Sequence, residues 1–257
     1  MELNYNRYSS DGAPLLILHG MLGNFNNWSW HSRRLAEHFA VYALDMRNHG
    51  ASPHAPQMDY PTMAQDVMAF MDQHGIDKAH ILGHSMGGKI AMQLALNAPQ
   101  RVLRLVVADV APVEYQKGEH DDIFSGLDAI DLASVQSRTE ADKQLAEWVD
   151  DEIVRQFLLS NLVREDDGFA WRINLPVIRD SYPLLRAAVS GEAGYQGEVL
   201  FVRGDRSDYV LPEYEAAITT LFPQAVIETI APAGHWLHAE KPETFQRIVG
   251  GFLRGEA

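Results

Sequence analysis

The sequence predicts an α/β protein with a mostly parallel central sheet. Three observations support this prediction. Short apolar runs alternate with helical patterns at both ends of the chain, 257 residues match one domain with an insertion, and 46% apolar against 22% charged residues is typical of a globular protein. Parallel strands are connected by right-handed helical crossovers and are buried on both faces, so we expect helices on both sides of one sheet.

Six apolar runs, rich in β-branched residues and bounded by turn residues, predict buried strands. In chain order they cover residues 15–18, 41–44, 80–82, 105–108, 199–202 and 225–227. Helical patterns lie between them at residues 63–74 and 89–97, and the second ends before Pro99 because the residue before a proline avoids the helical conformation. An apolar stripe over residues 243–253 predicts a last helix that packs on the sheet.

The alternation stops after the fourth predicted strand. Residues 113–190 carry helical patches at 133–149 and 152–162 but no strong strand signal. We therefore predict a mostly helical cap insertion, and a core domain formed by residues 1–112 and 191–257. The insertion holds 16 acidic and 8 basic side chains, so it contributes −8 to the net charge of −14.

Composition disfavours several classes of function. A net charge of −14 without a run of Lys or Arg would repel nucleic acid and anionic lipid headgroups. The absence of cysteine excludes disulfides and thiol nucleophiles, and it favours a reducing compartment, so we expect a cytoplasmic protein. No secretory signal and no apolar run near the ~18 residues of a membrane span are present, so no membrane insertion is expected. The histidines and carboxylates show no metal-ligand spacing, so no metal or other cofactor is expected, and nothing indicates the oligomeric state.

Residues 83–87, Gly-His-Ser-Met-Gly, form a G-x-S-x-G motif between a predicted strand and a predicted helix. The two glycines leave room where the chain turns sharply around a strained serine. Such a turn exposes the hydroxyl of Ser85 at the carboxyl edge of the sheet. We therefore predict that Ser85 is a nucleophile.

A nucleotide-binding site is the competing interpretation of the same segment. Residues 83–89 also fit G-x-x-x-x-G-K, and the run 105–109 is similar to the strand that ends in a magnesium-binding Asp. Ile90, however, occupies the position of the Ser or Thr whose hydroxyl binds Mg²⁺. The nucleotide interpretation therefore lacks a metal ligand.

A serine nucleophile needs a base, and the base needs an orienting acid. His235 is the best-placed base, because it follows the last predicted strand on a glycine-bearing loop at the same edge of the sheet. Asp109 follows one strand, and Asp205 and Asp208 follow the next. All three are compatible with the chain order Ser, Asp, His. The residues alone leave the choice of acid open.

The loop after the first strong strand, His-Gly-Met-Leu-Gly at residues 19–23, is a candidate for stabilising the oxyanion. We expect one donor to be the backbone amide of Met21 and the second to be that of Met86, directly after the nucleophile. The cap should roof the site. Five aromatic residues are candidates for an acyl pocket, of which we expect two or three to face the substrate: Phe25, Tyr115, Phe124, Trp171 and Trp236.

Together these segments resemble the α/β-hydrolase superfamily and, within it, the YbfF-type bacterial esterases. The resemblance rests on segments spread over nearly the whole chain: residues 19–23, 45–52, 83–89, 109–115, 171–177 and 234–242. It implies an eight-stranded sheet with a helical cap after the sixth strand, and serine esterase or thioesterase activity. It also implies a triad of Ser85, His235 and an acid at the strand end of Asp109. This sequence departs from the pattern, since it also has Asp205 and Asp208 where most α/β-hydrolases carry their acid.

The resulting hypothesis is hydrolysis of small-molecule acyl esters or thioesters, of short to medium chain, through an acyl-enzyme. Asp109 is the preferred acid and Asp208 the alternative. Two other functions stay open. The same residues serve non-acyl chemistry on this fold, such as carbon–carbon bond hydrolysis or elimination, and a ligand-binding module can retain them without turnover.

Overall fold

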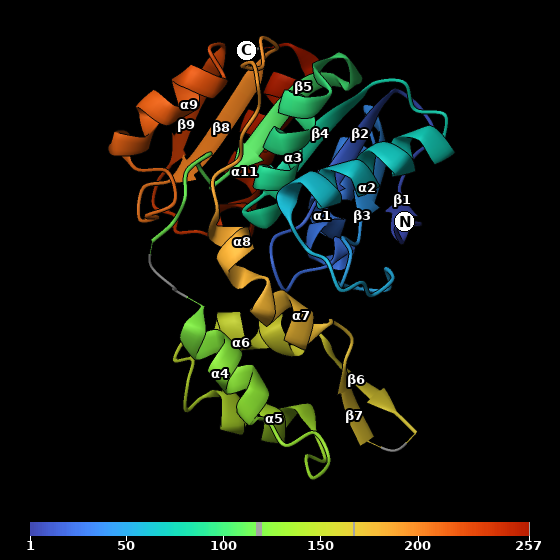
Figure 1. Cartoon of the computed structure of the whole chain (residues 1–257), viewed down its shortest axis with the longest axis vertical. Helices are drawn as coiled ribbons and strands as arrows, with labels where there is room; N and C mark the ends of the chain where they lie inside the picture. Colours follow the sequence, from blue (N-terminus) through green and yellow to red (C-terminus); the bar gives the residue numbers. More distant parts are fainter. Residues whose placement is uncertain (117–119, 167, 257) are drawn as a thin grey trace.

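The computed structural model describes residues 1–116, 120–166 and 168–256. Within these ranges, seven strands form one sheet in the order β1-β3-β2-β4-β5-β8-β9 (Figure 1). All neighbours pair in parallel except β1, which is antiparallel to β3. The strands are β1 Tyr5–Arg7, β2 Ala13–Leu18, β3 Phe39–Leu44, β4 Ala79–His84, β5 Val102–Ala108, β8 Val199–Gly204 and β9 Ala225–Ile230. The prediction of a mostly parallel sheet is confirmed.

The described sheet has one strand fewer than the eight that the resemblance implies. Twelve residues precede β2, and they form the three-residue strand β1 followed by a bend over residues 10–12. The long insertion therefore follows β5, the fifth strand along the chain, and not a sixth.

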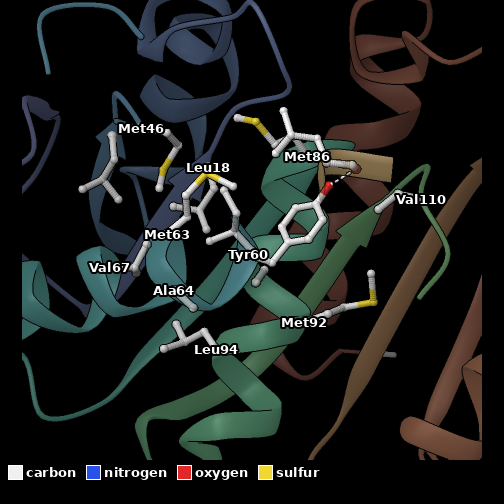
Figure 2. Packing of buried hydrophobic residues seen from close by; sticks show 14 of the residues in the cluster. Leu18, Met46, Tyr60, Met63, Ala64, Val67, Met86, Met92, Leu94 and Val110 are labelled. Carbon is white, nitrogen blue, oxygen red and sulfur yellow. Dashed lines mark hydrogen bonds between the residues drawn. The ribbon is translucent and has the colours of Figure 1, made fainter. Parts of the chain in front are cut away.

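Helices cover both faces of the sheet because alternate strand residues point to opposite sides. In β2, Leu18 belongs to the core beneath α2 and α3, whereas its neighbour Ile17 belongs to the core beneath α1 and α11. Figure 2 shows the first of these cores, in which Leu18 lies near Met63 and Val67 of α2. The helices of this part are α1 Ser29–Leu35, α2 Tyr60–Gln73, α3 Met86–Asn97, α9 Glu215–Leu221, α10 Leu237–Glu240 and α11 Pro242–Arg254, with 3-10 turns at Phe25–Trp28, Pro99–Arg101 and Pro212–Tyr214.

The chain between β5 and β8 adds no strand to the main sheet. It forms α4 Asp121–Ala129, α5 Arg138–Leu145, α6 Glu152–Leu159, β6 Leu162–Glu165, β7 Gly168–Trp171, α7 Leu175–Asp180 and α8 Tyr182–Arg186. Figure 1 shows α4, α5, α6 and the β6–β7 pair together at one end of the molecule. None of the helices in the described ranges is long and apolar enough to cross a membrane.

The antiparallel pair β6–β7 is an addition to the mostly helical insertion that the sequence predicts. Each strand has only four residues, and β7 is half-buried throughout, so neither carries the long apolar run that marks a buried strand. The helix expected at 133–149 is shorter, because the Ser137 hydroxyl accepts the Glu140 N–H and starts α5 there.

Candidate active site

Ser85 lies on a sharp turn between β4 and α3. It is half-buried, its φ is +53°, and its N–H donates to the carbonyl of Ala108 at 3.0 Å. A side chain at either motif glycine would collide with backbone. A Cβ on Gly83 would lie 2.1 Å from the Gly87 oxygen, and one on Gly87 would lie 2.2 Å from the Leu18 oxygen. The two glycines therefore allow the strained turn that presents the serine.

Asp109 and His235 are in direct contact. Asp109 directly follows β5, is fully buried, and has its Oδ2 atom 2.7 Å from Nδ1 of His235. Because a carboxylate oxygen accepts, the Nδ1–H of the imidazole donates in this pair. In a neutral ring the other nitrogen, Nε2, is then unprotonated and can accept a proton.

The last residue of β8 and the loop that follows it supply two further donors to Asp109. The backbone N–H of Gly204 donates to Oδ1 at 3.0 Å, and the hydroxyl of Ser207 donates to Oδ2. With His235, the buried carboxylate therefore has three hydrogen-bond donors. This contact follows from tertiary structure, and no motif in the sequence indicates Ser207.

The other two acid candidates lie elsewhere. Asp205 is exposed and accepts the Ala233 N–H at 2.8 Å. Asp208 is exposed and lines the rim of a cavity, and within the described ranges no hydrogen bond joins it to His235. Of the three aspartates, the structure brings Asp109 to the histidine.

His84 connects the loop of His235 to the turn of Ser85. Its Nε2 donates to the His235 carbonyl at 2.9 Å, and burial holds the pKa of His84 well below its usual range. The ring of His235 also stacks on Tyr209, with centroids 4.1 Å apart and planes at 26°. These two contacts hold the backbone and the ring of His235, and the first comes from the residue that precedes Ser85 in the chain.

Two buried histidines hold the loop that contains Met21. His19 donates from Nδ1 to the Gly20 carbonyl at 2.7 Å, and His49 accepts the Leu22 N–H at Nε2 at 3.0 Å. Burial lowers the pKa of His19 to about 4 and that of His49 to about 3. Both rings are therefore neutral at pH 7, so each has one nitrogen that donates and one that accepts a hydrogen bond.

A cavity of about 580 Å³ opens over Ser85, and both predicted oxyanion residues, Met21 and Met86, line it. The loop before Met21 passes close to the nucleophile, since a Cβ on Gly20 would lie 3.4 Å from the Ser85 Cβ. The remaining wall is rich in tyrosine and charged groups: Tyr60, Val110, Glu114, Tyr115, Gln116, His120, Tyr182, Leu185, Arg186, Asp208, Tyr209, Leu211, Glu213 and Tyr214.

Of the five predicted pocket aromatics, Tyr115 is part of this wall and four are not. Phe25 packs toward the core beneath α1 and α11. Phe124 is buried in α4, and Trp171 ends β7. Trp236 packs edge to face on a ring of α6. One of the five lines this cavity where two or three were expected to face the substrate, because aromatic type does not reveal which side of an element faces the site.

The wall residues that the sequence did not indicate come from separate segments. Tyr60 begins α2, Tyr182 begins α8, and Tyr209 and Tyr214 follow β8. His120 meets the Tyr182 hydroxyl through Nδ1 at 2.9 Å, and burial lowers its pKa to about 4. Within the described ranges, no group of three or more His, Asp or Glu side chains is arranged to hold a metal ion.

The family model described as the alpha/beta hydrolase fold matches residues 13–242. The chain belongs to the α/β-hydrolase family. This α/β-hydrolase is 40% identical to esterase YbfF of Escherichia coli, over 98% of this chain and 99% of the relative. It is 38% identical to the mouse protein named sn-1-specific diacylglycerol lipase ABHD11, over 98% of this chain and 85% of the relative.

A solved structure titled marine microorganism esterase superposes on this α/β-hydrolase with a TM-score of 0.94 and 37% identity, covering 96% of this chain and 98% of the other. Esterase and lipase relatives at this identity, over nearly the whole chain, make the protein a carboxylic ester hydrolase of the YbfF type.

Proposed function

We propose that this α/β-hydrolase cleaves its esters, and thioesters of similar shape, through a triad of Ser85, His235 and Asp109 and a covalent acyl-enzyme. The observation that carries the proposal is the 2.7 Å hydrogen bond between His235 Nδ1 and the buried Asp109 carboxylate. It fixes the imidazole in the tautomer that a general base requires.

In the first half-reaction, His235 Nε2 takes the proton of Ser85 and the serine oxygen attacks the ester carbonyl. The backbone amides of Met21 and Met86 stabilise the oxyanion, as their positions beside the serine support. His235 then protonates the leaving alcohol or thiol. Water repeats the sequence on the acyl-enzyme and releases the acid.

Asp109 orients the imidazole and stabilises it when it becomes charged. Its three donors keep the carboxylate in one orientation without water, since the side chain is fully buried. Asp208, exposed on the rim, is assigned no part in proton transfer.

Residues 113–190 are the proposed cap over a core of residues 1–112 and 191–257. A cavity of about 580 Å³ is in the range that encloses a drug-sized molecule, which suits small esters of short to medium acyl chain. The wall includes the exposed carboxylates of Glu114, Asp208 and Glu213, which disfavour strongly anionic substrates. The cytoplasmic location stays a prediction.

The decisive test is hydrolysis of p-nitrophenyl esters by wild type and three variants. Ser85→Ala should abolish turnover, and Asp109→Asn should lower kcat by on the order of 10⁴, because the amide favours the wrong imidazole tautomer. Asp208→Asn is the matched control, a same-sized change at the rim of the same cavity, and should retain most of the activity.

Rapid mixing then tests the covalent route, since a burst of p-nitrophenol at the first turnover reports acyl-enzyme accumulation. Full activity in Ser85→Ala would contradict the nucleophile assignment. Greater damage from Asp208→Asn than from Asp109→Asn would reverse the choice of acid. Ligand affinity without turnover on any ester would favour the binding-module alternative.

A further inference from the structure

Lys89 is a buried cation one helical turn after Ser85 on α3. It is 1% exposed, and no carboxylate in the described ranges forms an ion pair with it. Its Nζ instead donates to three backbone carbonyls, those of Val113 at 2.8 Å, Arg186 at 3.1 Å and Ala187 at 2.6 Å. An ammonium has three donors, so all of them are used.

These carbonyls belong to the two connections between the sheet and the inserted residues. Val113 lies on the incoming connection, and Arg186 and Ala187 lie on the outgoing one. The connections also bond to each other, because Tyr115 N–H donates to the Arg186 carbonyl at 3.0 Å and Arg186 Nη1 donates to the Gln116 carbonyl at 2.8 Å. We call the set Val113, Tyr115, Arg186 and Ala187 the cap junction.

The cap junction is continuous with the wall of the site. Lys89 Nζ lies 4.6 Å from the ring centroid of Tyr115, whose hydroxyl donates to the Tyr209 carbonyl at 2.7 Å. Tyr209 in turn stacks on His235. The outgoing connection has a second anchor in Tyr60 (Figure 2), whose hydroxyl donates to the carbonyl of Leu185.

A buried lysine is costly, and an apolar side chain would fill the same space on α3 without the cost of desolvation. Burial lowers the pKa of Lys89 to about 7, while the charge of Glu114 acts in the opposite direction. The ammonium donates to all three carbonyls, of which that of Arg186 also accepts the Tyr115 N–H, so packing alone does not account for the residue.

We propose that Lys89 is a positioning residue that holds both connections of the inserted residues against α3. It thereby fixes the position of Tyr115 and Arg186 in the wall of the cavity. The expected effect of Lys89 on substrate binding rests on the proposed function. Its expected effect on the stability of the two connections does not.

The test compares Lys89→Met with Gln93→Met, measuring hydrogen exchange and hydrolysis of p-nitrophenyl acetate and octanoate. Gln93 is the matched control, a buried polar residue one turn further along α3. Among the residues that the structure describes, its hydrogen bonds to the connections go to the Ser190 carbonyl at 2.8 Å and from the Ser190 N–H at 3.4 Å. In Lys89→Met, exchange of the Tyr115 amide should accelerate at least about tenfold, as loss of about one hydrogen bond's free energy implies. The Asp109 amide, bonded to Val202 in the sheet, should be unchanged.

The same variant should raise KM for the octanoate about tenfold and change kcat for the acetate less than about threefold, because the wall moves and the triad stays. In Gln93→Met, Tyr115 exchange and both kinetic constants should match wild type. Unchanged Tyr115 exchange and unchanged KM in folded Lys89→Met would overturn the proposal.

If Lys89→Met does not fold, Lys89→Gln decides, since its amide keeps two N–H donors. Exchange and octanoate KM at wild-type values in Lys89→Gln would then overturn the proposal, and intermediate increases would support it. Faster Tyr115 exchange in a protein without esterase activity would leave the cap junction standing and reject only the proposed function.

Discussion

The proposed acid, Asp109, follows the strand next to the one that precedes the proposed nucleophile, Ser85. β5 neighbours β4 in the sheet, so Asp109 at its end lies one strand from Ser85. One strand further in the sheet, Gly204 at the end of β8 and Ser207 in the loop after it donate hydrogen bonds to the Asp109 carboxylate. The end of β5 thus carries the carboxylate, and the end of β8 carries two of the hydrogen-bond donors that stabilise it.

Ser207→Ala tests this arrangement at a single residue. It removes a donor from the Asp109 carboxylate, and a hydrogen bond to a charged group contributes about 1.5 kcal/mol, so we expect kcat to fall about tenfold with KM unchanged. Steady-state kinetics on a p-nitrophenyl ester measures both constants. Ser10→Ala, on the exposed bend before β2, is the control. Wild-type kcat in Ser207→Ala would show that the hydroxyl is dispensable.

At the scale of elements, the loop after β2 depends on neutral histidines. Protonated His49 could not accept the Leu22 N–H, and protonated His19 could not accept the Met46 N–H that lies 3.0 Å from its Nε2. Both pKa values are lowered by burial, from 6.5 to about 4 for His19 and to about 3 for His49. At a pH between these pKa values and 6.5, the two histidines are protonated in the unfolded chain but not in the folded chain.

The loop should therefore lose stability in acid. The contribution of these histidines is fully present above pH 6.5 and is lost as the pH falls toward about 4 for His19 and about 3 for His49, because protons then favour the unfolded chain. For His19, the lowering of the pKa from 6.5 to about 4 corresponds to on the order of 3 kcal/mol in the free energy of unfolding. Urea unfolding at pH 7.0 and 4.5 measures this loss.

A pair of variants isolates the buried ring from the other groups that titrate in acid. His49→Gln retains an acceptor for Leu22 but cannot titrate, so the loss of stability between pH 7.0 and 4.5 should shrink by about 2 kcal/mol. His38→Gln, at an exposed position before β3, should leave that loss unchanged. Equal losses in both variants would contradict the role of His49.

At the scale of the whole molecule, sheet and insertion together enclose the cavity over Ser85. Met21 and Met86 come from the sheet side, while His120 and Tyr182 come from the insertion. The volume of about 580 Å³ limits the substrate from both sides. Activity should therefore depend on acyl length as a property of the assembled cavity.

We expect kcat/KM to rise from acetate to a maximum at medium chain length and to fall at palmitate, as buried apolar area increases until the cavity is full. Leu211→Ala removes a side chain from the wall and enlarges the cavity, so it should shift the maximum of kcat/KM to longer acyl chains. Leu103→Ala, at an exposed position outside the cavity, is the control. A profile that rises steadily to palmitate in wild type would show that this cavity does not bound the acyl chain.

Local signals in the sequence were enough to predict much of this protein. Each of the six apolar runs forms a strand, because a strand buried on both faces needs consecutive apolar residues. The stripe at residues 243–253 forms α11, because a helix that packs on a sheet needs apolar residues at helical spacing. The G-x-S-x-G motif predicts the turn at Ser85, since Gly83 leaves room for the backbone of Gly87 within the same motif.

Tertiary structure alone decided the contacts between distant segments. It brought Asp109 rather than Asp208 to His235, left Trp171 and Phe124 outside the cavity, and gathered two connections at Lys89. Each of these facts depends on distance across the sheet or on the side of an element that faces the site. Three aspartates at strand ends have the same local sequence properties, and only the packing of the whole chain distinguishes them.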